Sequence, residues 1–561
     1  MNQARWILTQ VDEELRRKTN LDGLTLSILS NRGYKTPEEI DEFMNLRLSS
    51  LHGPSLMKDS LKAVKAIINS IQNKEKIVVY GDFDCDGSMS IVTVYSAIKN
   101  LGGDISYYTN SRFVEGYQVS PEGVKNILKV NPDTKLIITA DNGIGGHDMV
   151  DFCKKNNIKV VITDHHIPGK SLPKAEAVVD PKRQDCPYPF KELCGAGVAW
   201  KLMYLLYKEM DKDLSYVYEL LDIVALATVA DVVPLVDENR VIVKEGLKLM
   251  RKEKRNIFKI LREETDVTEI TAHYTIGFVY GPMINAEGRI DGKPNRAIKM
   301  FLEHDEGDVR EYVRYLIKIN SKRKSATKTQ TKVAYNLVEM KGEVPHVILV
   351  RGPFHEGVVG LIAGRLREKY YRPTIVLTQA NGVWKGSARS IDAFHMKNAL
   401  DATSELLIGY GGHSQAAGLS IEGRNIFKFE KAINEFAKTN LTEEDLIPSV
   451  IVDHVVEDKI SYEMIETVNK LEPYGKGFEY PVFAVKNFNI TSPSYMGQNK
   501  KYAKLYTKSC SIVMWNEEDV EKYKGLGEPK NLRVVGCPEV NTYKGEESLQ
   551  FRVLDYNWMS L

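Results

Sequence analysis

The sequence predicts an α/β protein with two α/β lobes that are joined by a long helix and followed by a small β-barrel. Three observations predict this fold class. Short apolar runs alternate with helix-like segments between residues 76 and 180, which is the pattern of a parallel sheet with crossover helices. One charged segment over about residues 305–342 is typical of a single long helix. Short β-like runs dominate after about residue 450.

Composition limits the class of protein. The chain has 561 residues, enough for several domains, and its 43% hydrophobic and 27% charged residues are those of an ordinary soluble protein. With 76 Lys and Arg against 75 Asp and Glu, any site for nucleic acid has to be local. The six cysteines form no CxxC pair, which favours a reducing, cytoplasmic compartment. The polar N-terminus is unlike a signal peptide, and no apolar run is long enough to span a membrane.

The first lobe is expected to begin at residue 76, after a helical segment over residues 1–75. Its predicted strands are five apolar runs: KIVVYG (76–81), DISYYT (104–109), KLIITA (135–140), IKVVIT (158–163) and AEAVVD (175–180). Helix-like segments such as 119–130 and 146–157 separate the first four runs, so we expect the strands to pair in parallel. Residues 186–235 are then expected to be mostly helical.

Polar side chains follow each of the first four runs. They are Asp82, Asp84 and Asp86 after the first, Asn110 and Arg112 after the second, Asp141 after the third, and Asp164, His165 and His166 after the fourth. Ligands bind at the carboxyl ends of strands in open α/β sheets, so we expect these groups to converge. In an extended segment the three alternate aspartates would share one face, and a hard cation such as Mg²⁺ or Mn²⁺ would relieve their repulsion.

Each of these motifs has an alternative interpretation. The three aspartates could form an acidic surface turn, and a lone histidine is usually structural or merely exposed. Two adjacent histidines beside Asp164 can instead supply one imidazole to metal and the other to substrate. For Asp231, which lies in an apolar helical setting, spacing alone favours a helix or turn cap.

The second lobe is expected from residue 346, after the long helix. Ser387 and Arg389 resemble an anion pocket, because a hydroxyl and a guanidinium stand two residues apart after a strand. The turn at Gly411, Gly412 and His413 is expected to lead into a helix start whose backbone N–H groups approach a ligand, with tight packing as the alternative. Lysines of the long helix are open to two interpretations, a DNA path or a solvated face.

The predicted barrel carries cations interleaved with aromatic residues. They are Lys500, Lys501, Lys504 and Lys508 with Tyr502 and Tyr506. This combination is typical of a single-strand groove, although such strands are also common solvent faces.

Several motifs together resemble those of the DHH phosphoesterase superfamily. They are GDFDCDG (81–87), ADNG (140–143), DHH (164–166), TVADVVPL (228–235) and GGHSQAAG (411–418). Further stretches, including NSRFVEGY (110–117), GSARS (386–390) and LEPYGKG (471–477), are similar to the RecJ-like single-strand DNA exonucleases within that superfamily.

The resemblance covers about residues 76–480 and implies a domain organisation. It predicts a DHH domain over 76–305 with residues 1–75 packed on it, a linker helix over 306–342, a DHH-associated domain over 343–448, and an OB-type single-strand-binding domain over 449–561.

The resemblance also implies a site for two Mn²⁺ or Mg²⁺ ions. The ligands would be Asp82, Asp84, Asp86, Asp141, His165 and Asp231, with Asp141 bridging. His166 would face the scissile phosphate, and Asp164 would orient the neighbouring histidine. The residues that would contact substrate are Arg112, Ser387 and Arg389 around a terminal 5′-phosphate, Tyr117 stacked on a base, and Asn285, Arg289 and His413.

The implied activity is degradation of single-stranded DNA from the 5′ end to 5′-mononucleotides, in DNA repair and recombination. Two alternatives stay open: a phosphodiesterase for short RNA or cyclic dinucleotides, and a non-catalytic replication scaffold that binds single strands. A single-strand-binding protein and a helicase are the expected partners of a monomeric enzyme without membrane contact. The sequence departs from the family pattern at Met283, Gln118 and Phe478, which bears on DNA contacts rather than on metal ligands.

Overall fold

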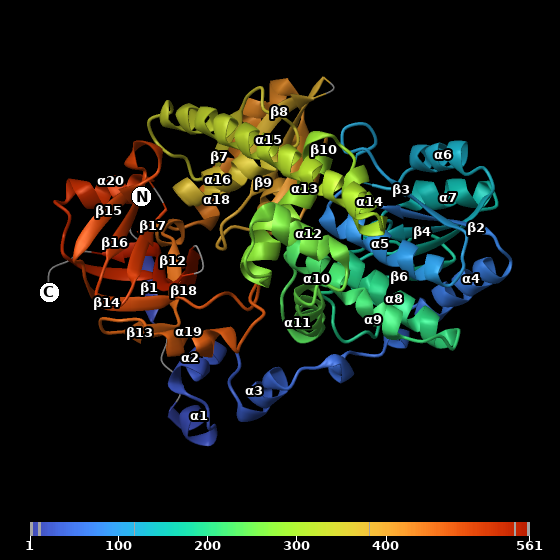
Figure 1. The fold of residues 1–561 in the computed structure, drawn as a ribbon. Coiled ribbons are helices and arrows are strands. Elements are labelled where there is room, and N and C mark those ends of the chain that lie inside the picture. The colour runs from blue at the N-terminus through green and yellow to red at the C-terminus, as the bar shows by residue number, and fades with distance from the viewer. Residues whose placement is uncertain are drawn as a thin grey trace. The chain divides into compact units, whose positions relative to one another are not determined.

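The computed structural model describes residues 4–8, 13–116, 118–380, 382–515, 517–543 and 546–557. Contacts divide the chain into two compact units. The larger unit contains residues 6–285, 294–314 and 451–561, and the smaller unit contains residues 1–5, 286–293 and 315–450. Figure 1 labels the helices and strands along the chain.

The larger unit contains a five-stranded parallel sheet with the strand order β3-β2-β4-β5-β6. Its strands are β2 (Lys76–Gly81), β3 (Ile105–Thr109), β4 (Thr134–Ala140), β5 (Lys159–Thr163) and β6 (Ala177–Val179). Each coincides with a predicted run to within two residues at either end. Because the chain adds β3 on one side of β2 and β4 on the other, the sheet has a switch point between β2 and β4. Ligands bind outside the carboxyl ends of the strands at such a point.

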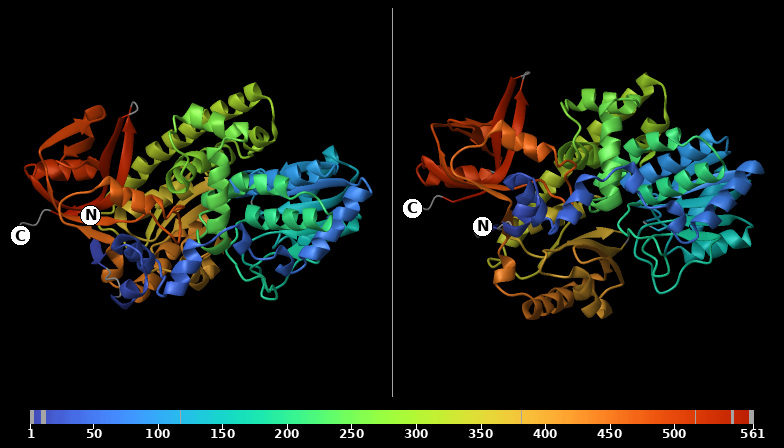
Figure 2. Two further views of the ribbon diagram at one scale, coloured as in Figure 1. Left: turned by 60° about the horizontal axis from the view of Figure 1, so that its bottom comes forward. Right: turned by 90° about the horizontal axis from the view of Figure 1, so that it is seen from below.

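Helices cover both faces of this sheet, which explains why its strands are apolar on both sides (Figures 1 and 2). α6 (Pro121–Val130) and α7 (His147–Lys155) share a core with one face, whereas α4 (Ser60–Gln72), α5 (Cys85–Asn100) and α8 (Gly195–Glu209) lie on the other. The helices that follow are α9 (Ser215–Glu219), α10 (Leu221–Ala230), α11 (Asp237–Arg251), α12 (Asn256–Thr265), the π-helix η3 (Ala272–Tyr280), α13 (Gly281–Ile290) and α14 (Asn295–Leu302).

The C-terminal part of the larger unit is a seven-stranded mixed sheet in the order β13-β14-β18-β19-β17-β16-β15. Its elements are β13 (His454–Val456), α19 (Tyr462–Asn469), β14 (Phe483–Asn489), β15 (Ser492–Met496), β16 (Tyr502–Tyr506), β17 (Ser511–Met514), α20 (Glu517–Gly525), β18 (Asn531–Tyr543) and β19 (Glu546–Asn557). Over the described residues, the strand pairings run from β13 to β15 without joining these two edges. The predicted barrel is therefore present as a sheet whose described pairings do not close.

The first helices share a core with this C-terminal sheet. α1 (Glu13–Lys18), α2 (Gly23–Asn31) and α3 (Pro37–Met44) contribute to one buried apolar cluster with α19 and six of the seven strands, and β15 packs against it through the partly buried Tyr495. Arg32, after α2, forms a buried ion pair with Asp453 at 2.5 Å. The prediction that residues 1–75 pack on the first lobe therefore fits only the later part of this segment, where the short 3-10 turns η1 (Leu48–Ser50) and η2 (Pro54–Leu56) contact α11 and α8, and α4 contacts α8 and β6. α2 is buried over most of its length, so it needs partners on several faces, and α19 and β13 supply two of them.

The smaller unit holds a five-stranded mixed sheet in the order β10-β11-β9-β8-β7. Its elements are β7 (Ile348–Arg351), α16 (Val359–Tyr370), β8 (Thr374–Ala380), β9 (Val383–Arg389), α17 (Met396–Ala402), β10 (Gly409–Gly412), β11 (Ala416–Ile421) and α18 (Ile426–Asn440). The predicted long helix is α15 (Glu306–Glu339), which begins in the larger unit and continues in the smaller. β1 (Arg5–Leu8) and β12 (Ser449–Val452) also fall where the chain changes unit.

One prediction for the smaller unit is wrong. The segment that contains Gly411, Gly412 and His413 does not start a helix but forms the antiparallel hairpin of β10 and β11, with Gly412 opposite Ala417. Side chains in β11 alternate between buried and more exposed positions, which is a period of two and therefore a strand pattern. Small residues permit close backbone packing at a helix start and in a hairpin alike, so their pattern does not distinguish the two structures.

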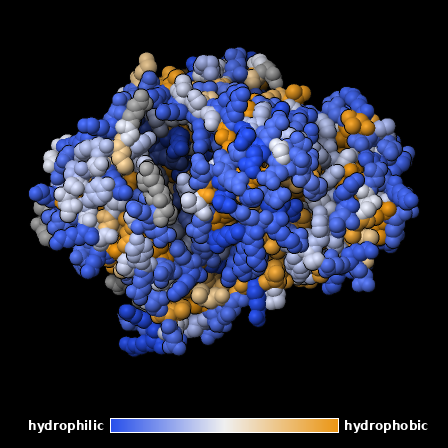
Figure 3. Space-filling model, viewed as in Figure 1, coloured by the Kyte–Doolittle hydropathy of each residue, from blue (hydrophilic) through white to orange (hydrophobic). Residues whose placement is uncertain are grey.

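The face drawn in Figure 3 is mainly hydrophilic, with apolar residues in small scattered groups. All six cysteines are buried and free. Among the helices that the described residues form, none has the length and apolar character needed to cross a membrane.

Candidate metal centre

The acidic loop after β2 folds tightly around the start of α5. Asp82 is buried directly after the strand, Asp84 caps α5 by accepting a hydrogen bond from the Gly87 amide at 3.0 Å, and Asp86 lies in the first helical turn. A side chain at Gly87 would place its Cβ 2.6 Å from the carbonyl oxygen of Asp82, so the turn requires glycine. The prediction that the three aspartates share one face of an extended segment is wrong, and they contribute to two different groups.

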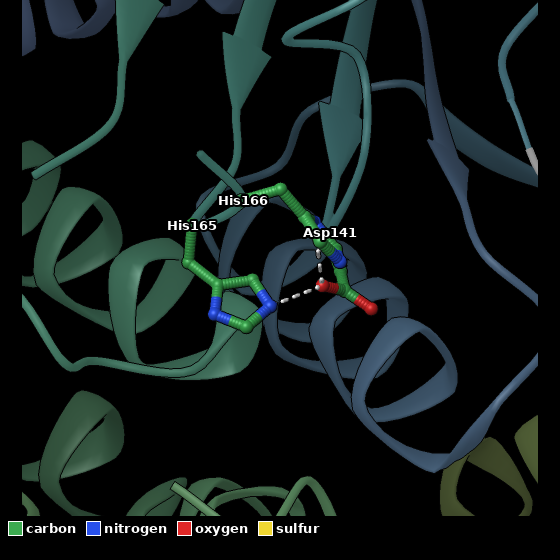
Figure 4. A group of neighbouring side chains, drawn as sticks. All are labelled: Asp141, His165 and His166. Carbon is green, nitrogen blue, oxygen red and sulfur yellow. Dashed lines mark ion pairs between the residues drawn. The ribbon is translucent and has the colours of Figure 1, made fainter. Parts of the chain in front are cut away.

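Side chains from three strand ends and one helix end form groups that could hold a cation. The groups are Asp82, Asp84 and Asp141; Asp86, His165 and Asp231; and Asp141, His165 and His166, with all ligand atoms of a group within 4.8 Å of one another. Asp141 belongs to two of these groups and lies beside both histidines (Figure 4). Its Oδ1 is 3.1 Å from Nε2 of His165. The side chains that the strand-end argument expected to converge are thus brought together at the switch point between β2 and β4.

Asp231 reaches this site from the end of α10. Its backbone N–H donates to the carbonyl oxygen of Ala227 at 2.9 Å, so the residue does end the helix, as spacing alone suggested. Its carboxylate oxygen Oδ2 also lies 3.8 Å from Nε2 of His165. Asp231 thus combines the capping position with membership of the second group.

The backbone holds Asp141 in an uncommon conformation at the end of β4. Its φ angle is +62°, in the left-handed region that aspartate tolerates better than most residues. Gly195, the first residue of α8, packs directly against it, since a Cβ at Gly195 would lie 2.5 Å from the Cβ of Asp141. The Asp141 side chain is therefore confined between its own strand end and α8.

Replacing Gly195 by alanine is expected to displace Asp141 and to weaken Mn²⁺ binding by roughly 10- to 100-fold, as when groups that position metal ligands are removed. Isothermal titration calorimetry of the full-length protein measures this effect. Gly364→Ala in α16 is the matched control, because it also adds a methyl group to a helical glycine but meets no atom within 4 Å. Equal Mn²⁺ affinities of the two variants would contradict the close packing of Gly195 against Asp141.

The N-terminus of α8 holds Asp86. The carboxylate accepts hydrogen bonds from the backbone amides of Gly195 at 2.6 Å and Ala196 at 2.8 Å. Burial, followed by the charge of Asp84, raises the pKa of Asp86 to about 6, although these two amides act in the opposite direction. The helix end thus orients Asp86 while leaving it inside an acidic group.

Asp164 is fully occupied by contacts within the protein. Its Oδ1 accepts hydrogen bonds from the backbone amides of His165 and His166 and lies 2.8 Å from Nδ1 of His166, and its Oδ2 accepts one from the amide of Ile144. Burial lowers the pKa of His166, but the hydrogen bond with Asp164 outweighs this effect and raises the pKa to about 9. Burial and the neighbouring His166 lower the pKa of His165 to about 3, so its imidazole is neutral and can offer a lone pair to a metal.

The buried carboxylates fit a divalent cation. Three buried carboxylate oxygens accept no hydrogen bond from the described residues. They are both side-chain oxygens of Asp82 and Oδ1 of Asp141. Burial, followed by the charges of neighbouring aspartates, raises the pKa of Asp82, Asp141 and Asp231 well above the usual range. Desolvated, mutually repelling oxygens are costly alone and are stabilised by a hard ion.

Two further predicted residues of the larger unit lie against the acidic loop. The guanidinium of Arg112 lies over the ring of Phe83, with Cζ 5.2 Å from the ring centroid. The side-chain oxygen of Asn285, in α13, accepts a hydrogen bond from the amide of Cys85 at 2.8 Å and thus helps to start α5. Tyr117 lies outside the described residues.

In the smaller unit, Ser387 and Arg389 come together at the start of α16. Nη1 of Arg389 donates to Oγ of Ser387 at 3.0 Å, and both side chains lie 3.0 Å from where a Cβ of Gly360 would be. The first turn of a helix offers unpaired amides to an anion, so hydroxyl, guanidinium and helix start form one positively polarised corner.

Arg289 and His413 also belong to the smaller unit. Nη1 of Arg289 lies 3.5 Å from the carbonyl oxygen of Gly357, just before α16. His413 is exposed in the turn between β10 and β11, where its Nδ1 accepts a hydrogen bond from the amide of Gln415 at 3.3 Å. Arg289 therefore lies near the start of α16, whereas His413 belongs to the hairpin.

One carboxylate near the site, that of Asp180, is not among the residues predicted from the sequence. Asp180 follows β6 and is fully buried, and burial followed by the charge of Asp164 raises its pKa to about 7. Its Oδ1 accepts a hydrogen bond from the amide of Lys182 at 2.7 Å. The same strand-end signal that located Asp141 was available at the end of the fifth run.

The three departures from the family pattern have different environments. Met283 and Phe478 are buried in the interior of the larger unit, where they fill space. Gln118 is exposed, and its backbone carbonyl accepts a hydrogen bond from the side chain of Asn110 at 2.9 Å.

Three stretches of the chain match known domain families. Residues 76–228 match the DHH family, N-terminal domain, residues 343–439 match the DHHA1 domain, and residues 453–555 match the RecJ OB domain.

The chain is 34% identical to the single-stranded-DNA-specific exonuclease RecJ of Escherichia coli (strain K12) over 98% of both chains. It is 32% identical to that of Bacillus subtilis (strain 168), over 99% of this chain and 71% of the relative. Its fold is similar to the crystal structure of RecJ in complex with Mn²⁺ from Thermus thermophilus, with a TM-score of 0.83 and 24% identity, over 100% of this chain and 80% of that chain.

Proposed function

Because the chain belongs to the RecJ family of single-stranded-DNA-specific exonucleases, we propose that it is a metal-dependent enzyme that degrades single-stranded DNA from the 5′ end to 5′-mononucleotides, in DNA repair and recombination. The observation that carries this proposal is the largely buried set of carboxylates and imidazoles at the switch point of the parallel sheet. Mn²⁺ and Mg²⁺ are the cofactors that such oxygen-rich groups fit.

The ligand assignment follows the two groups of side chains. Asp82, Asp84 and Asp141 would hold one ion, and Asp86, His165 and Asp231 the other, with Asp141 beside both. When bound, two such ions stabilise the charge that develops on the attacked phosphodiester. The sheet and α8 keep the carboxylates apart and fixed, so that little reorganisation is needed during the reaction.

His166 is the residue of this chain best placed to meet the scissile phosphate. Its imidazole is half-exposed, and the hydrogen bond between Nδ1 and Asp164 keeps it protonated near neutral pH with its pKa at about 9. Nε2 can therefore donate a charged hydrogen bond to a phosphate oxygen. Asp164 acts through His166 and is a positioning residue.

Ser387, Arg389 and the start of α16 support a binding pocket for the terminal phosphate. A terminal phosphate carries more charge and more free oxygens than an internal diester, so it matches a guanidinium, a hydroxyl and helix amides together. Recognition of the 5′ end by this corner would set the direction of degradation. Arg112, Asn285, Arg289 and His413 are further candidates for contact with the strand.

The substrate implies where and with whom the enzyme works. Its six buried thiols suit a reducing, cytoplasmic compartment. A helicase produces single strands and a single-strand-binding protein covers them, so these two classes of protein are the partners we propose, with the enzyme itself acting as a monomer.

The test is an assay on 5′- and 3′-end-labelled single-stranded and duplex DNA in Mn²⁺, Mg²⁺ or EDTA. We expect a 5′ label to be released at once as a mononucleotide from single strands, a 3′ label to be released last, and both reactions to stop in EDTA. Cleavage restricted to short RNA or cyclic dinucleotides would favour a phosphodiesterase of the same superfamily. Binding of single strands without hydrolysis in any metal would favour a scaffold.

A further inference from the structure

The loop that follows Asp231 has a strained backbone. It joins α10 to α11, and its residue Val232 is left-handed with φ +60°, as is Asp237, the first residue of α11, with φ +45°. A β-branched residue in this region is a genuine outlier. Such a conformation persists only where the surrounding structure holds it in place. The position of Asp231, one residue before the outlier, therefore depends on what packs against this loop.

Segment 471–478, with the sequence LEPYGKGF, packs against the loop. The carbonyl oxygen of Lys476 accepts a hydrogen bond from the amide of Leu235 at 2.7 Å. A Cβ at Gly475 would lie 2.6 Å from the side chain of Leu235, and one at Gly477 would lie 3.2 Å from Pro234. The two glycines thus allow the backbone of segment 471–478 to lie directly on the loop.

Arg240 fastens the segment to α11. The residue is only 4% exposed, and its guanidinium donates to three consecutive carbonyl oxygens of the segment: Leu471 at 2.7 Å, Glu472 at 3.1 Å and Pro473 at 2.9 Å. Its Cζ also lies 4.1 Å from the ring centroid of Phe43 and 4.6 Å from that of Phe478. A planar guanidinium can serve three acceptors and two ring faces at once, which an ammonium cannot.

Segment 471–478 also contributes side chains to the apolar core of the C-terminal sheet. Leu471, Tyr474 and Phe478 are buried in the cluster that α2, α3 and the seven-stranded sheet share. Tyr474 and Phe478 stack with their ring centroids 5.4 Å apart, and the hydroxyl of Tyr474 donates to the carbonyl oxygen of Val468 at 2.6 Å. The segment is therefore rigidly part of the C-terminal sheet on one side and of the Asp231 loop on the other.

We propose that segment 471–478, fastened by Arg240, is a positioning element for Asp231, through which the C-terminal sheet sets the geometry of the metal centre. The segment holds the loop in its left-handed conformation, and the loop in turn presents the Asp231 carboxylate to the group that contains Asp86 and His165. This inference rests on the proposed function in one respect, namely that Asp231 holds a metal ion.

The test compares Mn²⁺ binding by the full-length protein and its variants in isothermal titration calorimetry, with thermal unfolding recorded in parallel. Arg240→Lys keeps the charge but replaces the planar fork by a compact ammonium, which cannot reach the three carbonyl oxygens in one plane while two rings cover its faces, and we expect its Mn²⁺ affinity to fall by roughly 10-fold or more. Arg251→Lys is the matched control. Arg251 also contacts the segment, but only at its edge, through the side chain of Glu472 at 2.9 Å. The control is expected to bind Mn²⁺ like the unchanged protein.

Two further variants separate positioning from general stability. Gly475→Ala leaves the contacts of Arg240 in place and presses only on Leu235, so its Mn²⁺ affinity is expected to fall as well. Val232→Gly removes the strain, because glycine adopts a left-handed φ without cost, and the exposed Val232 side chain packs little. Added to Arg240→Lys, Val232→Gly is expected to restore part of the lost affinity.

The outcomes distinguish the two proposals. If the unchanged protein bound no Mn²⁺, the proposed function would fail. If it bound Mn²⁺ and both Arg240→Lys and Gly475→Ala bound it equally well, the positioning role would be overturned. A loss in Arg240→Lys that Val232→Gly leaves unrestored would also overturn it, because Arg240 would then act only through overall stability.

Discussion

Replacing Asp141 by asparagine is expected to slow hydrolysis of single-stranded DNA on the order of 10³-fold or more, because several kcal/mol of transition-state stabilisation depend on the ions that it would hold. Asp141 belongs to two of the three groups that could hold a cation, so its loss affects both positions. Asparagine is the right replacement for two reasons. It keeps the size of the side chain, and it tolerates the φ of +62° better than alanine does.

Single-turnover rates on a 5′-labelled oligonucleotide in Mn²⁺ measure this effect, with thermal unfolding in EDTA as the check on folding. Without metal, the carboxylate of Asp141 is buried among like charges, so its removal should not lower the melting temperature. Asp151→Asn, on the exposed side of α7, is the control with the same change of charge. Hydrolysis by the Asp141 variant at a rate close to that of the control would rule out the assignment of Asp141 as a shared ligand.

Replacing Arg389 by alanine is expected to reduce the preference for 5′-phosphorylated over 5′-hydroxyl strands by roughly 10- to 100-fold, because hydrogen bonds to charged groups contribute roughly 1.5–3 kcal/mol. The guanidinium and the Ser387 hydroxyl are joined at 3.0 Å beside the start of α16, so both donors face the same corner. A 5′-hydroxyl strand lacks the terminal charge and gains little from this corner. The variant should therefore lose rate mainly on the phosphorylated strand.

The quantity to compare is the ratio of the two rates, since a general loss of activity cancels in it. Arg424→Ala removes an exposed arginine of the same unit and should leave the ratio unchanged. An unchanged ratio in the Arg389 variant, or degradation that starts at the 3′ end, would show that this corner does not read the terminal phosphate.

The sequence predicted the parallel sheet, and it predicted that polar side chains would converge at one edge of that sheet. The strand positions were readable because a strand buried on both faces needs a short, continuous apolar run between turn residues, and this signal is local. The converging polar groups were readable because parallel strands end at one edge of the sheet, so Asp141 and His165 had to meet there. Asp231 is different: spacing alone favoured a helix cap, and only the resemblance to a known family placed it in the ligand set.

Local patterns failed where a short segment permits more than one structure. The small residues around Gly412 fit a helix start and a hairpin equally well, and pairing with β9 decided in favour of the hairpin. The three aspartates after β2 were expected in an extended segment, whereas the close approach of Gly87 to Asp82 starts the helix at Cys85. In both cases the deciding contact involves backbone atoms. Because every residue has these atoms, a pattern of side-chain types does not reveal where such a contact forms.

The sequence by itself thus determined where the apolar strands of the parallel sheet lie and which acids and imidazoles follow them. It also determined the family that these motifs resemble. Tertiary structure alone decided that the amides of Gly195 and Ala196 hold Asp86, that α2 and α3 share a core with the C-terminal sheet, and that Arg240 binds segment 471–478. These contacts join residues as far as several hundred positions apart. Hydrophobic periodicity records that a side chain is buried but not which distant partner buries it.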